Sequence, residues 1–474
     1  MSGGPDSRGR ARPRLLPALP RPAWVVLGGD FTSAVGSGLT LPCLFIYAHQ
    51  VRHLGYGTSG LVVATIALAS LAGNPLGGAA ADRWTPRRPL MAGLVLAAAG
   101  SAALALAHTA ADLLGAAGLL GLGVSVIWPA QDALLASLTG PAERSAVFSV
   151  RHACLNAGLG LGALGAAAVV SVTHPATFTA VYYADAASFL AFLPVLARLR
   201  PPAPPASEPS PADEPPPASE PPPASQHRTG FRQVLADKAF VRVWVLTAVI
   251  VTVSFGQSQS SFAGYATRPG GIDPRGLALA FAANTLTVVG AQLFVLRRLA
   301  GHRRTTGVAL AAAAWAASWA IVIAAGHLGA GAPAEIAFAA AMVIFALGET
   351  LLSPTLPAII NDLAPPGAAG RYNGLGALAF TTGFLAGPAG GAAALGAGWG
   401  TALFAALALA CAAAALAALR LNRHLPPAAN QIPAPAPSPS GPAHAGSDDR
   451  AGVRHGAAGS GPGVLAGQSE MTAA

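Results

Sequence analysis

Four acidic residues lie inside long apolar runs of the sequence, namely Asp30, Asp132, Asp185 and Glu349. A charge in the hydrocarbon of a membrane costs about 2.5–3.5 kcal/mol even on permissive scales, so such side chains face a bundle interior or a wet cavity. Burial favours the protonated form of a carboxyl group. These four residues are therefore predicted to be candidates for carrying a proton or for binding a cationic substrate.

Glu349 is the strongest of these candidates, because it is central in its apolar run and its counterpart in an internal repeat is Val124. For Asp185, which follows two tyrosines, a structural hydrogen bond to a neighbouring helix is an equal alternative. Arg151 is a basic residue well inside an apolar run. It is predicted either to pair with Asp132 or to extend its guanidinium to the membrane surface.

Other side chains of these runs could line a central pocket. Aromatic rings can hold a lipophilic cation, although in membrane helices they more often pack or lie at the interface. The polar candidates are Gln257, Ser258, Gln259, Asn284 and Gln292, and the aromatic candidates are Tyr47, Trp128, Phe255 and Phe345.

The composition is that of a membrane protein. Of the 474 residues 53% are hydrophobic and only 10% are charged, whereas soluble domains carry about 25% charged residues. The three cysteines lie in apolar runs, which predicts neither a disulfide framework nor a metal site. No phosphate-binding loop, nucleophile elbow or metal-binding cluster occurs in the sequence, so we predict no enzymatic activity and no cofactor.

Twelve runs are long enough to cross a bilayer, which needs roughly 20 mostly apolar residues. The sequence thus predicts an all-α integral membrane protein of twelve transmembrane helices. The expected spans are 24–47, 56–80, 89–108, 111–137, 147–172, 176–197, 241–264, 276–297, 305–327, 334–360, 371–396 and 399–420.

The basic residues indicate the orientation. With both termini in the cytoplasm, the loops on the opposite side keep only Arg52, Arg268 and Arg275. The cytoplasmic loops then hold a large excess of arginine, as the positive-inside rule requires. Because this placement accounts for the net charge of +9, a nucleic-acid partner is not predicted. We expect a multi-pass protein of the cell inner (plasma) membrane, acting as a monomer.

One stretch of the chain occurs twice. Shifted by 225 positions, residues 123–166 lie without a gap on residues 348–391, and Pro129 meets Pro354. Such a spacing is far longer than a solenoid repeat and favours two related bundles. A Pro-rich segment at 201–226 divides the spans six and six and favours an extended conformation.

These features predict the domain organisation, together with a short amphipathic helix at 231–240. The expected parts are a basic tail at 1–22, a six-helix bundle at 23–197, a cytoplasmic linker at 198–240, a second six-helix bundle at 241–421 and a disordered tail at 422–474.

The loop after the second span contains a glycine pair, an Asp-Arg pair and a downstream basic pair. Its residues are Gly73, Gly77, Asp82, Arg83, Arg87 and Arg88. Together with the two-bundle layout, this loop resembles the signature of the major facilitator superfamily over about residues 23–421. The resemblance implies two pseudo-symmetric bundles that alternate their access. With this motif, Asp82 is expected to act as a latch that pairs with an arginine, Arg83, Arg87, Arg88 or Arg144, and accepts from a helix N-terminus. For Arg87 and Arg88 the favoured alternative is that they only hold the loop in the cytoplasm.

A second motif points to a branch of that superfamily. The residues Gly383, Gly387, Pro388 and Gly391 resemble the helix motif of drug:proton antiporters, where it is expected in the fifth span. Here the fifth span carries Gly158, Gly162 and Gly165, with Ala163 at the proline position. The sequence departs from the family pattern in two places. The fourth span lacks the early arginine that many proton-coupled members carry. The loop after the eighth span keeps only the basic part of the loop signature, as Arg297, Arg298, Arg303 and Arg304.

The resemblance implies a secondary transporter that exports small amphipathic molecules in exchange for protons, and the glycine motif implies close helix packing. Two alternatives stay open: a metabolite importer or exporter with another coupling ion, and a receptor or scaffold that does not transport. The first predicts pH-insensitive transport and a more polar pocket. The second predicts that replacement of Glu349 by Gln leaves the phenotype unchanged. A membrane enzyme is disfavoured, because the sequence shows no convergent nucleophile or metal ligands.

Overall fold

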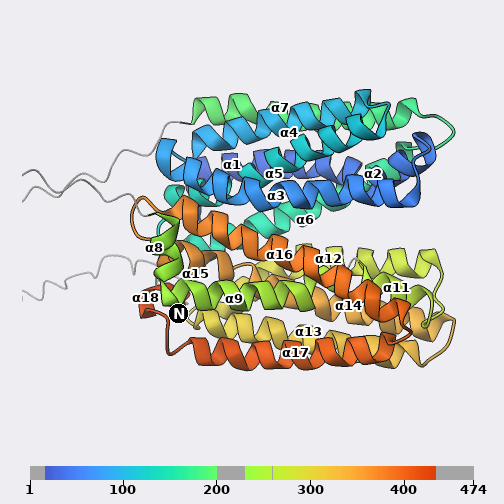
Figure 1. The fold of residues 1–474 in the computed structure, drawn as a ribbon. Coiled ribbons are helices and arrows are strands. Elements are labelled where there is room, and N and C mark those ends of the chain that lie inside the picture. Colours follow the sequence, from blue (N-terminus) through green and yellow to red (C-terminus); the bar gives the residue numbers. More distant parts are fainter. Residues whose placement is uncertain (1–15, 200–229, 259, 434–474) are drawn as a thin grey trace, which may run out of the picture. The chain divides into compact units, whose positions relative to one another are not determined.

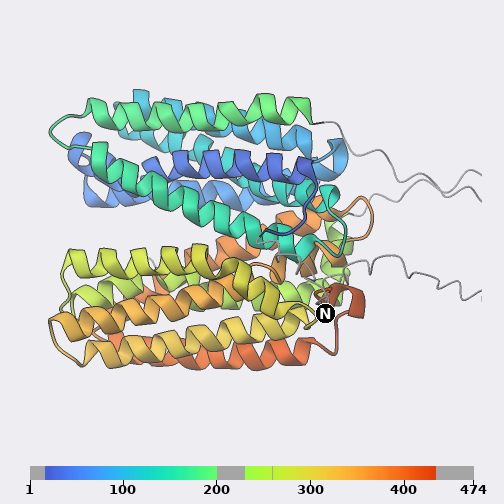
Figure 2. The same ribbon diagram turned by 180° about the vertical axis from the view of Figure 1, so that it is seen from behind.

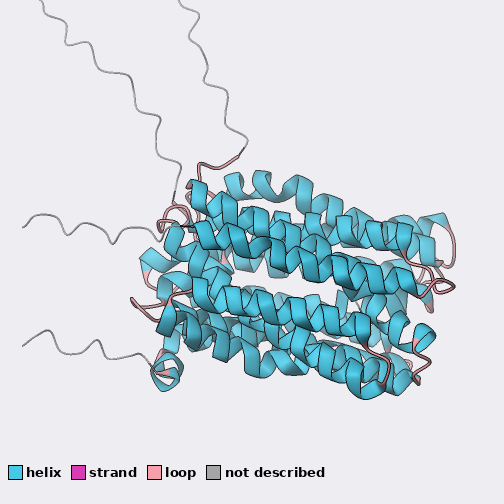
Figure 3. Cartoon of the chain, turned by 90° about the horizontal axis from the view of Figure 1, so that it is seen from above, coloured by secondary structure: helices cyan, strands magenta, loops and turns pink. Residues whose placement is uncertain are grey.

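The computed structural model of the protein describes residues 16–199, 230–258 and 260–433 (Figure 1). This part of the chain is built of helices and loops and contains no β-strand (Figure 3). Twelve helical segments are long and apolar enough to cross a membrane. All twelve predicted spans are confirmed, and their ends differ from the expected ones by a few residues.

The first six spans run from α1 to α7. Their bounds are α1 (Arg21–Thr40) with η1 (Leu41–Cys43), α2 (Leu44–Ile46) and η2 (Tyr47–Val51), then α3 (Tyr56–Trp84), α4 (Arg87–Leu106), α5 (Ala110–Leu138), α6 (Arg144–Val169) and α7 (Ala176–Arg198).

The second six spans run from α9 to α17 and follow a short helix, α8 (Phe231–Ala236). Their bounds are α9 (Lys238–Val253) with α10 (Phe255–Ser258) and α11 (Ser261–Thr267), then α12 (Pro274–Leu299), α13 (Arg304–Gly326), α14 (Ala332–Leu352) with α15 (Leu356–Leu363), α16 (Ala369–Gly396) and α17 (Gly400–Leu421).

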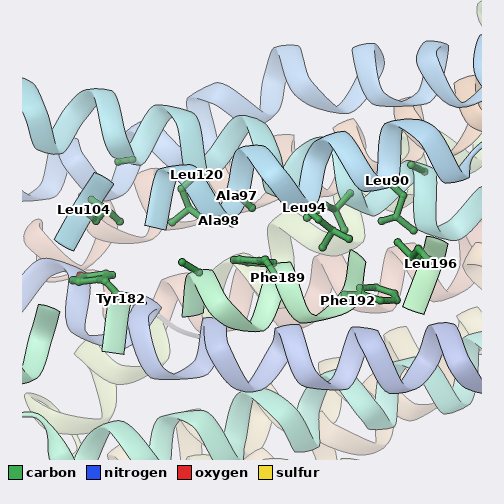
Figure 4. Packing of buried hydrophobic residues seen from close by; sticks show 14 of the residues in the cluster. Leu90, Leu94, Ala97, Ala98, Leu104, Leu120, Tyr182, Phe189, Phe192 and Leu196 are labelled. Atoms are coloured by element: carbon green, nitrogen blue, oxygen red, sulfur yellow. The ribbon is translucent and has the colours of Figure 1, made fainter. Parts of the chain in front are cut away.

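Two large clusters of buried apolar side chains correspond to the two sets of spans. One contains residues from 23 to 196 together with Ala358, and the other contains residues from 234 to 425. Figure 4 shows part of the first cluster, where Leu90 and Leu94 of α4 face Phe189 and Phe192 of α7. We call the two sets of spans the N-half and the C-half.

The two halves lie side by side, and α6 and α12 run along their boundary (Figure 2). We call the end where α1 and α9 begin and α7 ends the linker end. The short helices α8, α15 and α18 (Pro427–Asn430) lie at this end (Figure 1).

The internal repeat coincides with helix boundaries. Leu138 ends α5 and Leu363 ends α15, 225 positions apart, and the same offset joins Arg144 at the start of α6 to Ala369 at the start of α16. The repeated prolines differ in effect. Proline removes a backbone donor and clashes with the preceding turn, yet α5 continues through Pro129, whereas α14 and α15 are separated at 353–355.

The glycine motif brings helices into close contact. A Cβ atom at Gly162 of α6 would collide with the backbone carbonyl of Val35 in α1. In the C-half, a Cβ atom at Gly387 of α16 would lie 2.9 Å from the Cα atom of Gly256 in α10. Three further motif residues make close contacts of the same kind: Gly158, Gly383 and Gly391. Gly165 is less crowded, and Pro388 lies within the continuous α16.

Two predictions about the ends of the halves need correction. The segment expected to be a disordered tail from 422 is ordered to residue 433, because Ala429 and Ile432 are buried and residues 430–432 bond to the loop before α13. The helix expected over 231–240 ends at Ala236, because the Asp237 side chain caps a new helix at the Ala239 and Phe240 amides. The predicted conformations of 1–15, 201–226 and 434–474 lie outside the described residues.

Candidate functional site

A charged cluster lies inside the N-half. Nη1 of Arg151 in α6 is 2.6 Å from Oδ1 of Asp132 in α5, and its Nε is 3.3 Å from Oδ2 of Asp30 in α1. The arginine is only 6% exposed, so its charge is compensated by two carboxylates rather than by water. The predicted pairing of Arg151 with Asp132 is therefore present, and extension to the membrane surface is not.

The helical hairpin formed by α5 and α6 explains why Asp132 and Arg151 lie side by side. Asp132 lies six residues before Leu138, the last residue of α5, and Arg151 lies seven residues after the start of α6 at Arg144. At 1.5 Å per helical residue, the two side chains stand at nearly the same depth in the bundle. Close packing of α1 on α6 at Gly158 then brings Asp30 to the same level.

Trp128 extends the cluster by one aromatic ring. The Arg151 guanidinium carbon is 4.8 Å from the ring centroid, which is a cation–π contact. The ring lies one helical turn before Asp132 and is 43% exposed. Among the other predicted aromatic candidates, Tyr47 and Phe345 are fully buried in packing contacts.

One further buried polar atom lies near this cluster. Oγ of Ser33, about one turn after Asp30 in α1, has no hydrogen-bond partner among the described residues. Buried polar atoms normally bond to protein or water. The cluster therefore offers the Ser33 hydroxyl to a ligand or to water, in the same half as the exposed ring of Trp128.

Glu349 approaches from the other half. Its Oε2 atom in α14 lies 3.7 Å from Nε2 of His152, the residue after Arg151. Glu349 is 7% exposed, and its contact with His152 joins α14 of the C-half to α6 of the N-half. Of the four predicted acids, three thus gather around Arg151 and His152.

Asp185 is not part of this group. It accepts hydrogen bonds from Oγ of Ser101 at 2.8 Å and from Oγ1 of Thr40 at 3.2 Å. These bonds tie α7 to α4 and α1 inside the N-half. The geometry is that of the structural alternative considered for Asp185.

Of the predicted polar residues of the C-half, Gln292 contacts the N-half and Gln257 contacts its own half. Gln292 of α12 donates from Nε2 to Oγ of Ser149 in the N-half at 2.7 Å and to Oγ of Ser353 at 2.8 Å. Gln257 instead donates to the carbonyl oxygen of Gly387 at 2.9 Å, within its own half. Gln259 lies outside the described residues.

Asp82 binds the opposite half at the linker end. Its carboxylate accepts from the backbone amides of Gly370 at 2.6 Å and Arg371 at 3.0 Å, and from Nη1 of Arg371 at 2.9 Å. A carboxylate at a helix N-terminus is favoured by the helix dipole. The predicted contact with a helix N-terminus is present, at the start of α16. We correct the predicted arginine: it is Arg371, because Gly78 lets α3 approach α16 directly.

The arginines expected as partners make other contacts. Arg87 donates to the carbonyl oxygens of Leu199 and Ala197 at 2.9 and 2.7 Å, and Arg83 lies over the ring of Trp84. Arg144 pairs with Asp362 of α15. In the second span, Gly73 and Gly77 pack closely against Ser125 and Val126 of α5. A groove of about 800 Å³ beside Asp82 is lined by Arg83, Trp84, Arg88 and Arg371, among others.

Residues 26–269 match the family description Major Facilitator Superfamily, which covers more than half of the chain. The chain belongs to the major facilitator superfamily. It is thus a multi-pass membrane transporter, and its family and structural neighbours are transporters rather than enzymes.

Related proteins include two that are named for drug resistance. The chain is 25% identical to an uncharacterized MFS-type transporter of Bacillus subtilis, YttB, over 78% of this chain and 87% of that protein. It is 27% identical to multidrug resistance protein MdtH of Aeromonas salmonicida, over 78% and 86%. Quinolone resistance protein NorA of Staphylococcus aureus is 26% identical over 36% of this chain and 43% of its own length.

The solved structures of the superfamily share the fold. A bacterial homologue of the iron transporter ferroportin in an outward-facing state has a TM-score of 0.67 at 14% identity, covering 85% of this chain and 100% of that one. The transporter FucP in an outward conformation has a TM-score of 0.64 at 14% identity, covering 85% and 98%.

Proposed function

We propose that this transporter exports small amphipathic, drug-like molecules in exchange for protons, by alternating access of one central site. The observation that carries the proposal is the arrangement around Arg151. Two N-half carboxylates and the exposed ring of Trp128 lie beside it, and Glu349 approaches from the C-half. The similarity to MdtH, named a multidrug resistance protein, supports this reading of the chemistry.

The contacts between halves support alternation. Besides the pair of His152 and Glu349, polar contacts join Asn74 to Thr381, Ser149 to Gln292 and Asp82 to Arg371. These contacts occupy the part of each helix near the linker end or the middle of the bundle. In this proposal the arginine-rich linker end faces the cytoplasm, so the arrangement is closed to the cytoplasm, as an outward-facing transporter requires.

Glu349 is the proposed coupling residue. Asp132 and Asp30 share the charge of Arg151, whereas among the described residues the charged partner of Glu349 is His152, at the longer distance of 3.7 Å. A proton that binds the Glu349 carboxylate makes it neutral and removes its attraction for a cationic substrate. Substrate release to the outside and proton entry are then two steps at one side chain.

The test is transport in proteoliposomes with an imposed pH gradient, with ethidium as the probe. The proposal expects gradient-driven ethidium movement in the wild type and its loss in Glu349→Gln. A matched control is Glu335→Gln, which changes an acid in the first turn of the same helix. If the wild type moves ethidium equally with and without the gradient, proton exchange is excluded. If ethidium transport by Glu349→Gln is still driven by the pH gradient, another carboxyl group carries the proton.

Two other functions give different results in the same assay. A metabolite transporter with another coupling ion is insensitive to the pH gradient. A receptor or scaffold moves no ethidium in any variant. The location in the plasma membrane, the cytoplasmic termini and the monomeric state are part of this proposal.

A further inference from the structure

The two halves meet along two lines at the linker end. The first line joins α3 to α16 and is held by Asp82. The second joins α6 to α12 and α13, where Ser145 accepts from Nε of Arg304 at 3.3 Å. Among the residues of the loop at 297–304, which corresponds to the Asp82 loop, four are arginines and none is acidic. The second line therefore needs an acid from another element.

Asp362 of α15 supplies that acid. Its two carboxylate oxygens accept separately, one from Arg144 of the N-half and the other from Arg304 of the C-half. The Asp362 side chain is 6% exposed and the Arg304 side chain 1% exposed. A buried arginine of this kind must have its guanidinium donors satisfied in place, because an unpaired buried charge is strongly destabilising.

The segment after the last span completes this arrangement, and we call residues 427–433 the C-terminal strap. The carbonyl oxygen of Ala429 accepts from Nη1 of Arg304 at 3.0 Å. Oδ1 of Asn430 accepts from the amide of Thr305 at 2.9 Å, in the first turn of α13, a helix that lacks a side-chain cap from its own N-cap residue. The strap thus holds both the charge and the start of the helix that carries it.

Backbone pairing and burial fix the strap in place. The amide of Gly301 donates to the carbonyl of Ile432 at 2.9 Å, and the amide of Ile432 donates to the carbonyl of His302 at 3.0 Å. The Ile432 side chain is 3% exposed and packs with Val295 and Leu299 of α12. Such a two-way backbone pair and an apolar anchor define one position for the segment.

We propose that the C-terminal strap is a gate element, which stabilises the state closed at the linker end by holding Arg304 where Asp362 can bridge it to Arg144. This inference rests on the proposed alternation between two states. Loosening the strap frees Arg304 to leave Asp362 and Ser145, so the halves lose the contact between Arg304 and Ser145 and keep only the pair of Arg144 and Asp362 along this line. Asp362 thereby replaces the acid that the loop at 297–304 lacks, and the strap holds the arginine that it binds.

The test compares Asn430→Ala with Gln431→Ala in the full chain. Gln431 is exposed and uses only its backbone in the pairing, so it is the matched control. Spin labels at the exposed positions Ala142 and Arg423, with the three native cysteines replaced by serine, report the separation of the halves at the linker end. Loss of a helix cap typically changes an equilibrium by about fivefold, so Asn430→Ala is expected to raise the ratio of long to short distances about fivefold.

Three results are decisive. An increase of the long-distance population in Asn430→Ala but not in Gln431→Ala supports the gate role. An unchanged distribution in Asn430→Ala, in a protein whose wild type populates both distances, overturns it, even if the variant melts at a lower temperature. A wild type with one fixed distance at every pH and ethidium concentration overturns the alternation itself. Arg304→Lys, which keeps the charge but loses the planar guanidinium, is expected to behave like Asn430→Ala.

Discussion

Asp82 and Arg371 lie in opposite halves of the chain, and Oδ2 of Asp82 is 2.9 Å from Nη1 and 3.0 Å from the backbone amide of Arg371. One carboxylate thus binds both the side chain and the helix terminus of its partner. Hydrogen bonds to a charged group contribute about 1.5–3 kcal/mol each. This contact is therefore a strong point of closure between α3 and α16.

Asp82→Asn should weaken that closure. The amide keeps the shape of the carboxylate but loses its charge, and with it the attraction to Arg371 and to the α16 N-terminus. We expect the ratio of linker-open to linker-closed molecules to rise by roughly tenfold or more, measured by the spin-label distance between Ala142 and Arg423. Asp112→Asn is the control, since Asp112 caps the start of its own helix, α5. That start lies at the end of the bundle away from the linker end. An unchanged distance in Asp82→Asn would show that the contact does not hold the halves together.

Arg151→Met should destabilise the N-half. The substitution leaves Asp30 and Asp132 close together without a positive charge, and breaking a buried ion pair from one side costs about 3–5 kcal/mol. A large fall in the melting temperature of the purified protein is the expected result. The triple variant with Asp30→Asn and Asp132→Asn should recover much of that loss, because no uncompensated charge remains. Equal melting temperatures for wild type and Arg151→Met would contradict the assigned ion pairs.

Gly387→Ala and Gly390→Ala should differ sharply although they are three residues apart. A Cβ atom at Gly387 would lie 2.9 Å from both Gly256 Cα and the Thr252 carbonyl oxygen, whereas one at Gly390 meets nothing within 4 Å. Overpacking of this kind costs typically about 1–3 kcal/mol. We expect a lower melting temperature for Gly387→Ala and little change for Gly390→Ala. Similar losses in both variants would point to a general intolerance of α16 rather than to its contact with α10.

Local sequence patterns predicted the elements well. Hydropathy located all twelve spans, and the 225-residue repeat placed helix ends at Leu138 and Leu363. The pairing of Asp132 with Arg151 was predictable because both lie on one helical hairpin, where sequence spacing fixes their depth.

Contacts between the halves were not predictable in this way. Asp82 was assigned to arginines of its own region, yet its partner is 289 positions away. His152 and Asp362 were not considered, because a pairing across the halves depends on how two bundles dock and not on periodicity within either. The strap was missed for a related reason: its few buried side chains, such as Ile432, lie in a Pro- and Ala-rich stretch without a helical pattern.

The separation of α14 from α15 around Pro354 has a mechanical consequence. In the N-half, Trp128 and Asp132 belong to one continuous helix, α5, which ends at Leu138. In the C-half, Glu349 lies in α14 and Asp362 in α15, on either side of the break at 353–355. A change of angle at this break changes the spacing of the two acids without displacing either half as a whole. The repeated helix is thus continuous at its proline in the N-half and interrupted there in the C-half.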